Sequence, residues 1–181
     1  TDTSDTVTIT NRAERLKRIL IDDDPELNIR DIKGKIKKFK ENGGNVVIID
    51  YLQLIQLSQE ETKGRNREQQ VAYISRKLKT YSKLFKIPII AIAQLSRSSE
   101  QRPDKKPLLS DLRESAGIEM DADCVIFPYR AEYYDKNATD ADGVSLQGMA
   151  EIIVAKNRDG STDSIYTQFD GSRTFFIPIN Q

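Results

Sequence analysis

Residues 46–50 constrain the fold of this chain more than any other stretch. Four β-branched apolar residues, Val46 to Ile49, follow the breaker Asn42-Gly43-Gly44 and run directly into the carboxylate of Asp50. An apolar run without alternation is typical of a parallel strand that is covered on both faces. In open α/β sheets, ligands bind at the carboxyl ends of such strands. The stretch predicts a buried central strand with Asp50 at a ligand-binding edge; a cap for the next turn is the alternative role of this residue.

The rest of the pattern predicts an α/β fold. Apolar residues at helical spacing predict helices over 29–39, capped by Asn28, and over 71–85. Further apolar runs predict strands at 18–21 and at 89–94, the second ending in Gln94. The order strand, helix, strand favours a right-handed parallel crossover between the Asp50 strand and the Gln94 strand.

The second half of the chain predicts a run of strands. Residues 124–127 form a third apolar segment, and after residue 148 the alternation predicts antiparallel strands. These strands are expected at 150–156, 164–169 and 174–179, with turns at 159–161 and 170–172. Residues 1–18 form a polar lead-in, in which Asn11 and Glu14 resemble the capping box of a short helix.

Composition excludes several classes of chemistry. Histidine is absent from the 181 residues, which removes His-based acid–base catalysis, Ser-His-Asp triads and Cys/His zinc sites. The 28 Lys and Arg match the 28 Asp and Glu, so nucleic-acid contacts would have to come from local basic loops such as 63–67 and 97–106. The single cysteine, Cys124, excludes a disulfide framework, is expected to be buried, and favours a reducing, cytoplasmic location. No apolar run reaches the roughly 20 residues of a membrane helix.

Seven short motifs occur in a fixed order along the chain. They are Val47–Leu54, Gly64–Arg67, Ala93–Arg97, Gln101–Lys105, Leu109–Ser115, Asp121–Asp123 and Ala155–Gly160. Together they closely resemble the C-terminal motor domain of the DnaB-like replicative helicases, over roughly residues 19–179. The resemblance implies that 19–181 are the C-terminal portion of a RecA-like P-loop NTPase fold. That fold has a parallel central sheet with antiparallel strands at its C-terminal end.

The resemblance assigns nucleotide chemistry to four residues. Asp50 corresponds to the Walker B carboxylate, which holds Mg²⁺ through its water shell. Gln94 corresponds to the residue that hydrogen-bonds the γ-phosphate and reports its loss. Lys156 and Arg158 match the Lys-x-Arg that reaches into the nucleotide site of the next subunit as a piston and arginine finger. The plainer alternatives are a structural glutamine that closes a strand and a basic strand end before a hairpin.

Other basic residues receive roles from the same resemblance. Arg130 is expected near the nucleotide of a neighbouring site, or else in a surface ion pair, and Arg65 and Arg67 in a loop or subunit interface. A further segment resembles the one that follows the backbone of single-stranded DNA. Its residues are Arg113, Glu114, Ser115, Ala116 and Gly117, whereas the family more often places the glycine directly after the serine.

As a whole, the resemblance implies an ATP-dependent replicative DNA helicase that unwinds duplex DNA by translocating on one strand as a homo-hexameric ring. ATP and Mg²⁺ would be its cofactors, and a primase and a helicase loader its partners. The glycine-rich loop ending in Gly-Lys-Ser/Thr that cradles phosphates is absent from this chain. The chain is therefore expected to be part of a motor domain, as an excised piece or one half of a split protein. Alone, it would bind ATP poorly, hydrolyse none, and leave one side of the Asp50 strand or its neighbours uncovered.

Two other classes remain as alternatives. The acidic residues 22–24, followed by Asp50 and a later lysine such as Lys156, resemble a response-regulator receiver. The spacing from Asp23 to Asp50 leaves room for one helix, but a receiver requires two helices and a strand there. A non-catalytic helicase-like module for DNA binding or ring assembly is the other alternative, although it would have no need to retain Asp50, Gln94, Lys156 and Arg158 together.

Overall fold

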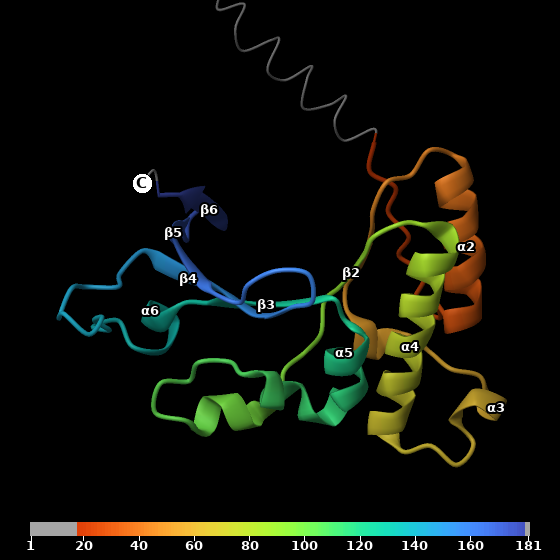
Figure 1. Ribbon diagram of the computed structural model, residues 1–181, viewed down its shortest axis with the longest axis horizontal. Coiled ribbons are helices and arrows are strands. Elements are labelled where there is room, and N and C mark those ends of the chain that lie inside the picture. Colours follow the sequence, from red (N-terminus) through yellow and green to blue (C-terminus); the bar gives the residue numbers. More distant parts are fainter. Residues whose placement is uncertain (1–17, 180–181) are drawn as a thin grey trace, which may run out of the picture.

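Two capped helices are the longest elements in the first half of the chain. The computed structural model describes residues 18–179, apart from the side chains of residue 97 and residues 113–116, so the helix expected near Asn11 lies outside it. Helix α2 (Ile29–Glu41) begins at Asn28, whose side chain accepts hydrogen bonds from two main-chain N–H groups of the first turn. Helix α4 (Arg67–Phe85) begins at a capping box formed by Asn66 and Gln69. Both predicted helices are confirmed (Figure 1).

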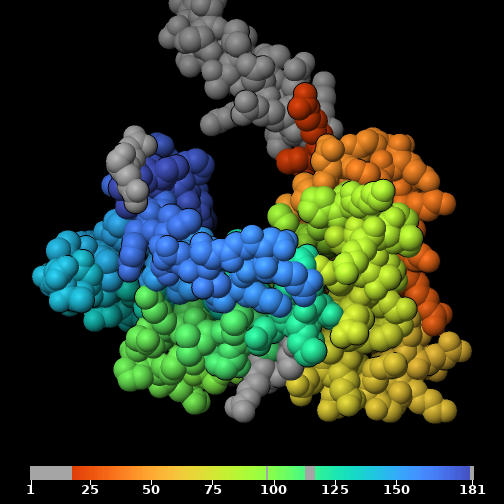
Figure 2. Space-filling model, viewed as in Figure 1, coloured from red at the N-terminus to blue at the C-terminus, as the bar shows by residue number. Residues whose placement is uncertain are grey.

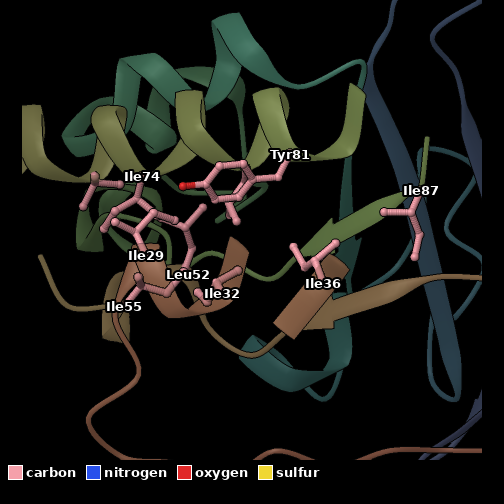
Figure 3. Close-up of a cluster of buried hydrophobic side chains, with 10 residues drawn as sticks. Ile29, Ile32, Ile36, Leu52, Ile55, Ile74, Tyr81 and Ile87 are labelled. Atoms are coloured by element: carbon pink, nitrogen blue, oxygen red, sulfur yellow. The ribbon is translucent and has the colours of Figure 1, made fainter. Parts of the chain in front are cut away.

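The two predicted strands that flank α4 form a parallel pair. Strand β1 (Val47–Ile49) pairs with β2 (Ile89–Ala91), so the predicted parallel crossover is confirmed. Residues of β1 and β2 that point to one face pack against the apolar stripes of α2 and α4. Figure 3 shows this core, in which Ile74 and Leu52 are almost fully buried. Because Leu52 and Ile55 belong to it, the segment after Asp50, including η1 (Leu52–Leu54), is anchored at the end of β1.

The other face of the parallel pair is open, and the prediction that β1 is buried on both faces is wrong. Ile48 is 63% exposed, and its register partner Ile90 is exposed beside it. The expectation that one side of the Asp50 strand or its neighbours is uncovered concerns missing sheet strands, and among the described residues β1 pairs only with β2. In this chain nothing among residues 18–179 covers the second face, because both long helices pack against the first. Burial of a strand depends on the layers around it, which the apolar run by itself does not specify.

The predicted strand at 18–21 is also wrong. These residues are irregular, and Leu20 is 76% exposed between Ile19 and Ile21, which are exposed as well. The segment is attached to α2 instead through Lys35, whose ammonium lies 2.6 Å from the carboxylate of Asp22 and 3.5 Å from that of Asp24. An apolar run becomes a strand only where a neighbour pairs with its main chain, and within 18–179 no strand does so here.

The C-terminal half forms a separate antiparallel sheet in the order β3-β4-β5-β6. Its strands are β3 (Cys124–Tyr129), β4 (Met149–Asn157), β5 (Ser164–Asp170) and β6 (Phe175–Pro178). The four predicted strands and both predicted turns are confirmed. Val125 and Phe127 point inward to a second small core, whereas Cys124 lies on the outer side of the strand and is exposed. The prediction that Cys124 is buried is therefore wrong, because alternation along β3 places it outside.

Three short helices lie between the two sheets in the chain: η2 (Arg97–Gln101), η3 (Leu109–Ser115) and α5 (Ala116–Asp121). Two others lie elsewhere, α3 (Gln59–Thr62) before α4 and α6 (Ala131–Tyr134) between β3 and β4. In Figure 2 the part built from α2 and α4 (orange to yellow-green) and the antiparallel sheet (blue) are separated at the top by a hollow. Helix α5 packs against α4 and joins the two parts lower down. Within residues 18–179, none of the helices combines the length and apolar character that a membrane crossing requires.

Candidate functional site

Asp50 and Gln94 lie at the same edge of the parallel pair. Asp50 directly follows β1 and Gln94 comes shortly after β2, and the carboxyl ends of these neighbouring parallel strands meet. The ladder continues past both strands, since the N–H of Ile92 donates to the carbonyl of Ile49 (2.9 Å) and the N–H of Leu52 donates to the carbonyl of Ile92 (2.8 Å). Both polar residues are exposed, so this edge is open to a ligand.

Gln53 holds the main chain of Gln94. The N–H of Gln94 donates to Oε1 of Gln53 (3.2 Å), and Nε2 of Gln53 donates to the carbonyl of Gln94 (3.1 Å). The carbonyl of Gln53 in turn accepts a hydrogen bond from the guanidinium of Arg67, the first residue of α4. Gln53 was missed by the sequence analysis, because a single glutamine after a strand carries no periodic signal.

Lys156 and Arg158 lie at the far end of β4 and just beyond it. Nζ of Lys156 donates to the carbonyl of Glu119 in α5 (2.5 Å). Nη1 of Arg158 lies 3.0 Å from Oδ1 of Asp123, and the N–H of Arg158 donates to the carbonyl of Asp123 (2.8 Å). The other carboxylate oxygen of Asp123 pairs with Lys79 of α4. The hydrogen bond from Lys79 lowers the pKa of Asp123, and the charge of Arg158 adds to this against the opposing effect of burial.

Arg130 packs on an aromatic ring between β3 and α6. Its guanidinium carbon lies 3.9 Å from the centroid of the Phe169 ring, and Nη2 lies 2.5 Å from Oε1 of Glu132. The second oxygen of Glu132 accepts the N–H of Gly148 (2.7 Å). The Nε of Arg130 is buried and has no hydrogen-bond partner among the described residues. Arg130 thus forms the ion pair that was its alternative role, with Glu132, and its role near a nucleotide stays a prediction.

The predicted DNA segment spans the end of η3 and the start of α5. Only Gly117 has described surroundings here, and it packs directly on α4. A Cβ at Gly117 would lie 2.5 Å from the Cβ of Ala72 and 2.7 Å from its Cα. Nε of Arg76 in α4 also donates to Oδ1 of Asp121 in α5 (2.6 Å). Close packing of α5 on α4 therefore explains why position 117 is a glycine, independently of any contact with DNA.

Asp111 organises the polar loop 96–107 that precedes η3. Its buried carboxylate receives both terminal nitrogens of Arg102, at 2.9 and 2.5 Å, and the main-chain N–H of Leu108 at 2.7 Å. The carbonyl of Asp111 accepts the N–H of Ser96 (3.0 Å). The hydrogen bonds from Arg102 lower the pKa of Asp111 and outweigh its burial, which acts in the opposite direction. The loop is therefore held in one shape next to the predicted DNA segment.

The predicted nucleotide residues fall into two groups. The edge of the parallel pair carries Asp50 and Gln94, and the end of β4 carries Lys156 and Arg158. Among the residues that the structure describes, no hydrogen bond or ion pair joins one group to the other. This arrangement is consistent with two half-sites that face different neighbours.

Comparisons with known proteins agree with the fold. The family model for the DnaB-like helicase C terminal domain matches residues 1–177. The chain is 44% identical over 164 residues to the replicative DNA helicase DnaB of Geobacillus stearothermophilus, covering 90% of this chain and 34% of that protein. It is 43% identical over 167 residues to the replicative DNA helicase DnaC of Bacillus subtilis, with the same coverage of each.

Two solved structures share the fold. One is a DnaB-like replicative helicase described with its interactions with primase, and the other is described as an ATPase domain. Each has a TM-score of 0.75 and 36% sequence identity over 85% of this chain, which spans 35% of the first and 52% of the second. These neighbours define a RecA-like ATPase domain of the DnaB type. The chain belongs to the DnaB-like helicase C-terminal domain family, and it spans about a third of the length of the curated relatives it matches.

Proposed function

We propose that this chain is part of an ATP-dependent replicative DNA helicase that unwinds duplex DNA by translocating on single-stranded DNA as a homo-hexameric ring. The observation that carries the proposal is that Asp50 and Gln94 both lie at one open edge of parallel strands in a chain of this family. An acidic group and an amide at this edge suit a magnesium-bound phosphate. The receiver alternative is wrong, because the chain belongs to a helicase family.

Asp50 has the features of a residue that binds Mg²⁺ through water. Its carboxylate is exposed. It accepts no hydrogen bond from the other described residues and forms no ion pair with them. No group of three or more potential metal ligands exists within the described part of the chain. A single carboxylate at a phosphate site fits Mg²⁺, which keeps most of its waters and takes further ligands from the phosphates. When bound, ATP with Mg²⁺ would supply the terminal phosphoryl group, which passes to water as ADP leaves.

Gln94 supplies an amide at the same edge. Its side chain can donate to a terminal phosphate oxygen or to the attacking water, and its main chain is fixed by Gln53. The phosphate-cradling loop has no counterpart in this sequence, so the remaining two thirds of a DnaB-like chain would have to supply it. Loss of the terminal phosphate would remove the partner of Gln94.

Lys156 and Arg158 are proposed to act on the nucleotide of an adjacent subunit. Both are held at the end of β4 by contacts to the α5–β3 junction, at Glu119 and Asp123. Arg158 is exposed, so its guanidinium can turn toward a neighbour. A guanidinium supplied in trans stabilises charge that develops on the phosphoryl group, and in other NTPases this is worth about 10³ to 10⁵ in rate. Arg130 on Phe169 is proposed to lie near the same neighbouring nucleotide.

The segment from Arg113 to Gly117 is proposed to follow single-stranded DNA. Its support comes from the motif order and from its position directly after a loop that Asp111 and Arg102 hold in shape. Contacts to a phosphate backbone from side chains and main-chain N–H groups are the usual basis of sequence-independent binding. A primase and a helicase loader are proposed partners and the cytoplasm the proposed location; one structural neighbour is described with its primase interactions.

A chimera tests this function. The chain replaces the matching third of the Geobacillus stearothermophilus helicase, and ATP hydrolysis is measured with and without single-stranded DNA. The expected result is DNA-stimulated hydrolysis that Asp50→Asn lowers by at least roughly a hundredfold, because the magnesium contact is lost. An assembled chimera with no DNA-stimulated hydrolysis would overturn the proposal and favour the non-catalytic module.

A further inference from the structure

Gln53 forms an amide-to-peptide pair with the main chain of Gln94. One hydrogen bond runs in each direction between the same two groups, at 3.2 Å from the N–H of Gln94 and at 3.1 Å to its carbonyl. A side-chain amide that donates and accepts in this way reproduces the pairing that a residue of a neighbouring strand would provide. The pair therefore continues the contact between the two chain segments beyond the ends of β1 and β2.

The position of Gln53 is itself fixed from two sides. The preceding residue, Leu52, is buried in the core and donates its N–H to the carbonyl of Ile92 (2.8 Å). The carbonyl of Gln53 accepts a hydrogen bond from Arg67, which directly follows the N-cap residue Asn66 and is the first residue of α4. The main chain of Gln53 is thus held between the core and the N-terminus of a long helix, and its side chain connects it to Gln94.

We propose that Gln53 is a positioning residue that holds Gln94 at the phosphate edge, with Arg67 as its support. Side chains that act in a transition state must be held within a fraction of an ångström of the productive geometry. Gln94 is exposed and lies beyond β2, which ends at Ala91, so its main chain would otherwise be free to move. The catalytic part of this inference rests on the proposed function, whereas the clamp itself can be measured separately.

Amide hydrogen exchange in the chain tests the clamp without any catalysis. Gln53→Ala removes both hydrogen bonds, and we expect the Gln94 amide to exchange about tenfold faster while the Ile92 amide keeps its rate. Gln56→Ala is the matched control, since the side chain of this nearby glutamine only donates one long hydrogen bond, to the carbonyl of Pro25 (3.4 Å). An unchanged Gln94 rate in Gln53→Ala would overturn the inference.

The chimera tests the catalytic consequence. A positioning role predicts that Gln53→Ala lowers kcat by roughly tenfold and leaves the KM for ATP within about twofold, because the lost stabilisation belongs to the transition state. Arg67→Ala is expected to change kcat in the same direction by less, and the double variant by less than the product of the two effects. An unchanged kcat in Gln53→Ala, alongside inactivity of Asp50→Asn, would refute the inference and leave the proposed function standing.

Gln53→Glu adds a readout that a structural defect would not give. An ionised carboxylate cannot donate to the carbonyl of Gln94, and its second oxygen repels that carbonyl and displaces the side chain, whereas a protonated carboxyl can donate and accept as the amide does. The Gln94 exchange rate of Gln53→Glu, divided by that of the wild type at each pH, should therefore fall toward one as the pH approaches about 4. Gln53→Ala should show no such recovery. A pH-independent ratio for Gln53→Glu would contradict the two-way hydrogen bond.

If the wild-type chimera shows no DNA-stimulated hydrolysis, only the proposed function is contradicted. The exchange experiments on the chain still decide whether Gln53 holds Gln94.

Discussion

Asp123 holds Arg158 by its side chain and its main chain at once. The guanidinium lies 3.0 Å from the carboxylate, and the N–H of Arg158 donates to the carbonyl of Asp123 over 2.8 Å. Lys79 of α4 pairs with the other carboxylate oxygen. The proposed finger is therefore tied to a helix of its own subunit. Its orientation depends on an acidic residue that belongs to a recognised motif but received no role from the sequence.

Removal of Asp123 should misplace the finger. Asp123→Ala leaves Arg158 and Lys79 without their shared partner, and the chimera is expected to lose roughly tenfold in kcat. Little change in stability is expected, because the ion pair is largely exposed. Steady-state ATPase assays and thermal unfolding measure the two effects. Asp163→Ala, in the turn between β4 and β5, removes the same charge nearby and serves as the control. Equal activities of the two variants would contradict a role for Asp123.

The Arg102–Asp111 pair should make stability depend on pH. The pKa of Asp111 is lower in the folded chain than its ordinary value of 3.8, since Arg102 hydrogen-bonds the ionised form. Its contribution is therefore fully present above about pH 4 and is lost as the pH falls through the folded pKa. Asp111→Asn should lower the melting temperature at neutral pH and reduce the further loss on acidification. A wild type and a variant whose melting curves shift in parallel from about pH 6 to about pH 3 would contradict this.

Gly117 should tolerate no side chain. In Gly117→Ala the new methyl would overlap Ala72, and we expect a destabilisation of about 1 to 3 kcal/mol. Urea unfolding of the chain measures it. Ala72→Gly removes one of the two close atoms, so the double variant should recover part of the loss. A Gly117→Ala variant as stable as the wild type would mean that α5 does not pack this closely on α4.

The core around α4 should respond very differently from the open face of β1. Ile74 is fully buried, and Ile74→Ala should cost about 3 to 4 kcal/mol through lost burial and a residual cavity. Ile48 is 63% exposed, and Ile48→Ala should change the unfolding free energy of the chain by less than about 1 kcal/mol. Urea unfolding of both variants makes the comparison. Similar losses at both positions would contradict the one-sided packing of the parallel pair.

Local pattern and turn chemistry were sufficient to predict much of this fold. Apolar runs that end in Asp50 and Gln94, separated by one helix, favour parallel strands with a shared edge, and the Asp-Gly turns indicate the C-terminal hairpins. Exposure was not predictable in the same way. Ile48, Cys124 and the segment at 18–21 lie in apolar runs, yet what covers such a run depends on layers that the run does not encode.

The contacts that support the proposed site residues could not be predicted from the sequence either. Gln53, Asp123 and Phe169 act through contacts to segments that are distant in the sequence, and no period or spacing marks them. Gly117 was noticed as part of a motif, but its packing on Ala72 is visible only when α4 and α5 are brought together. Motif order could suggest which residues face the ligand, whereas the residues that hold them required the structure.

The most direct test of the central claim mixes two defective subunits of the chimera. Arg158→Ala lacks the finger but keeps its own magnesium site, and Asp50→Asn has the opposite defect. A finger that acts in trans predicts that each variant alone hydrolyses little ATP in the presence of single-stranded DNA, and that mixed rings recover part of the wild-type rate. An Arg158→Ala chimera with unchanged turnover, or mixed rings no more active than either variant alone, would contradict the claim.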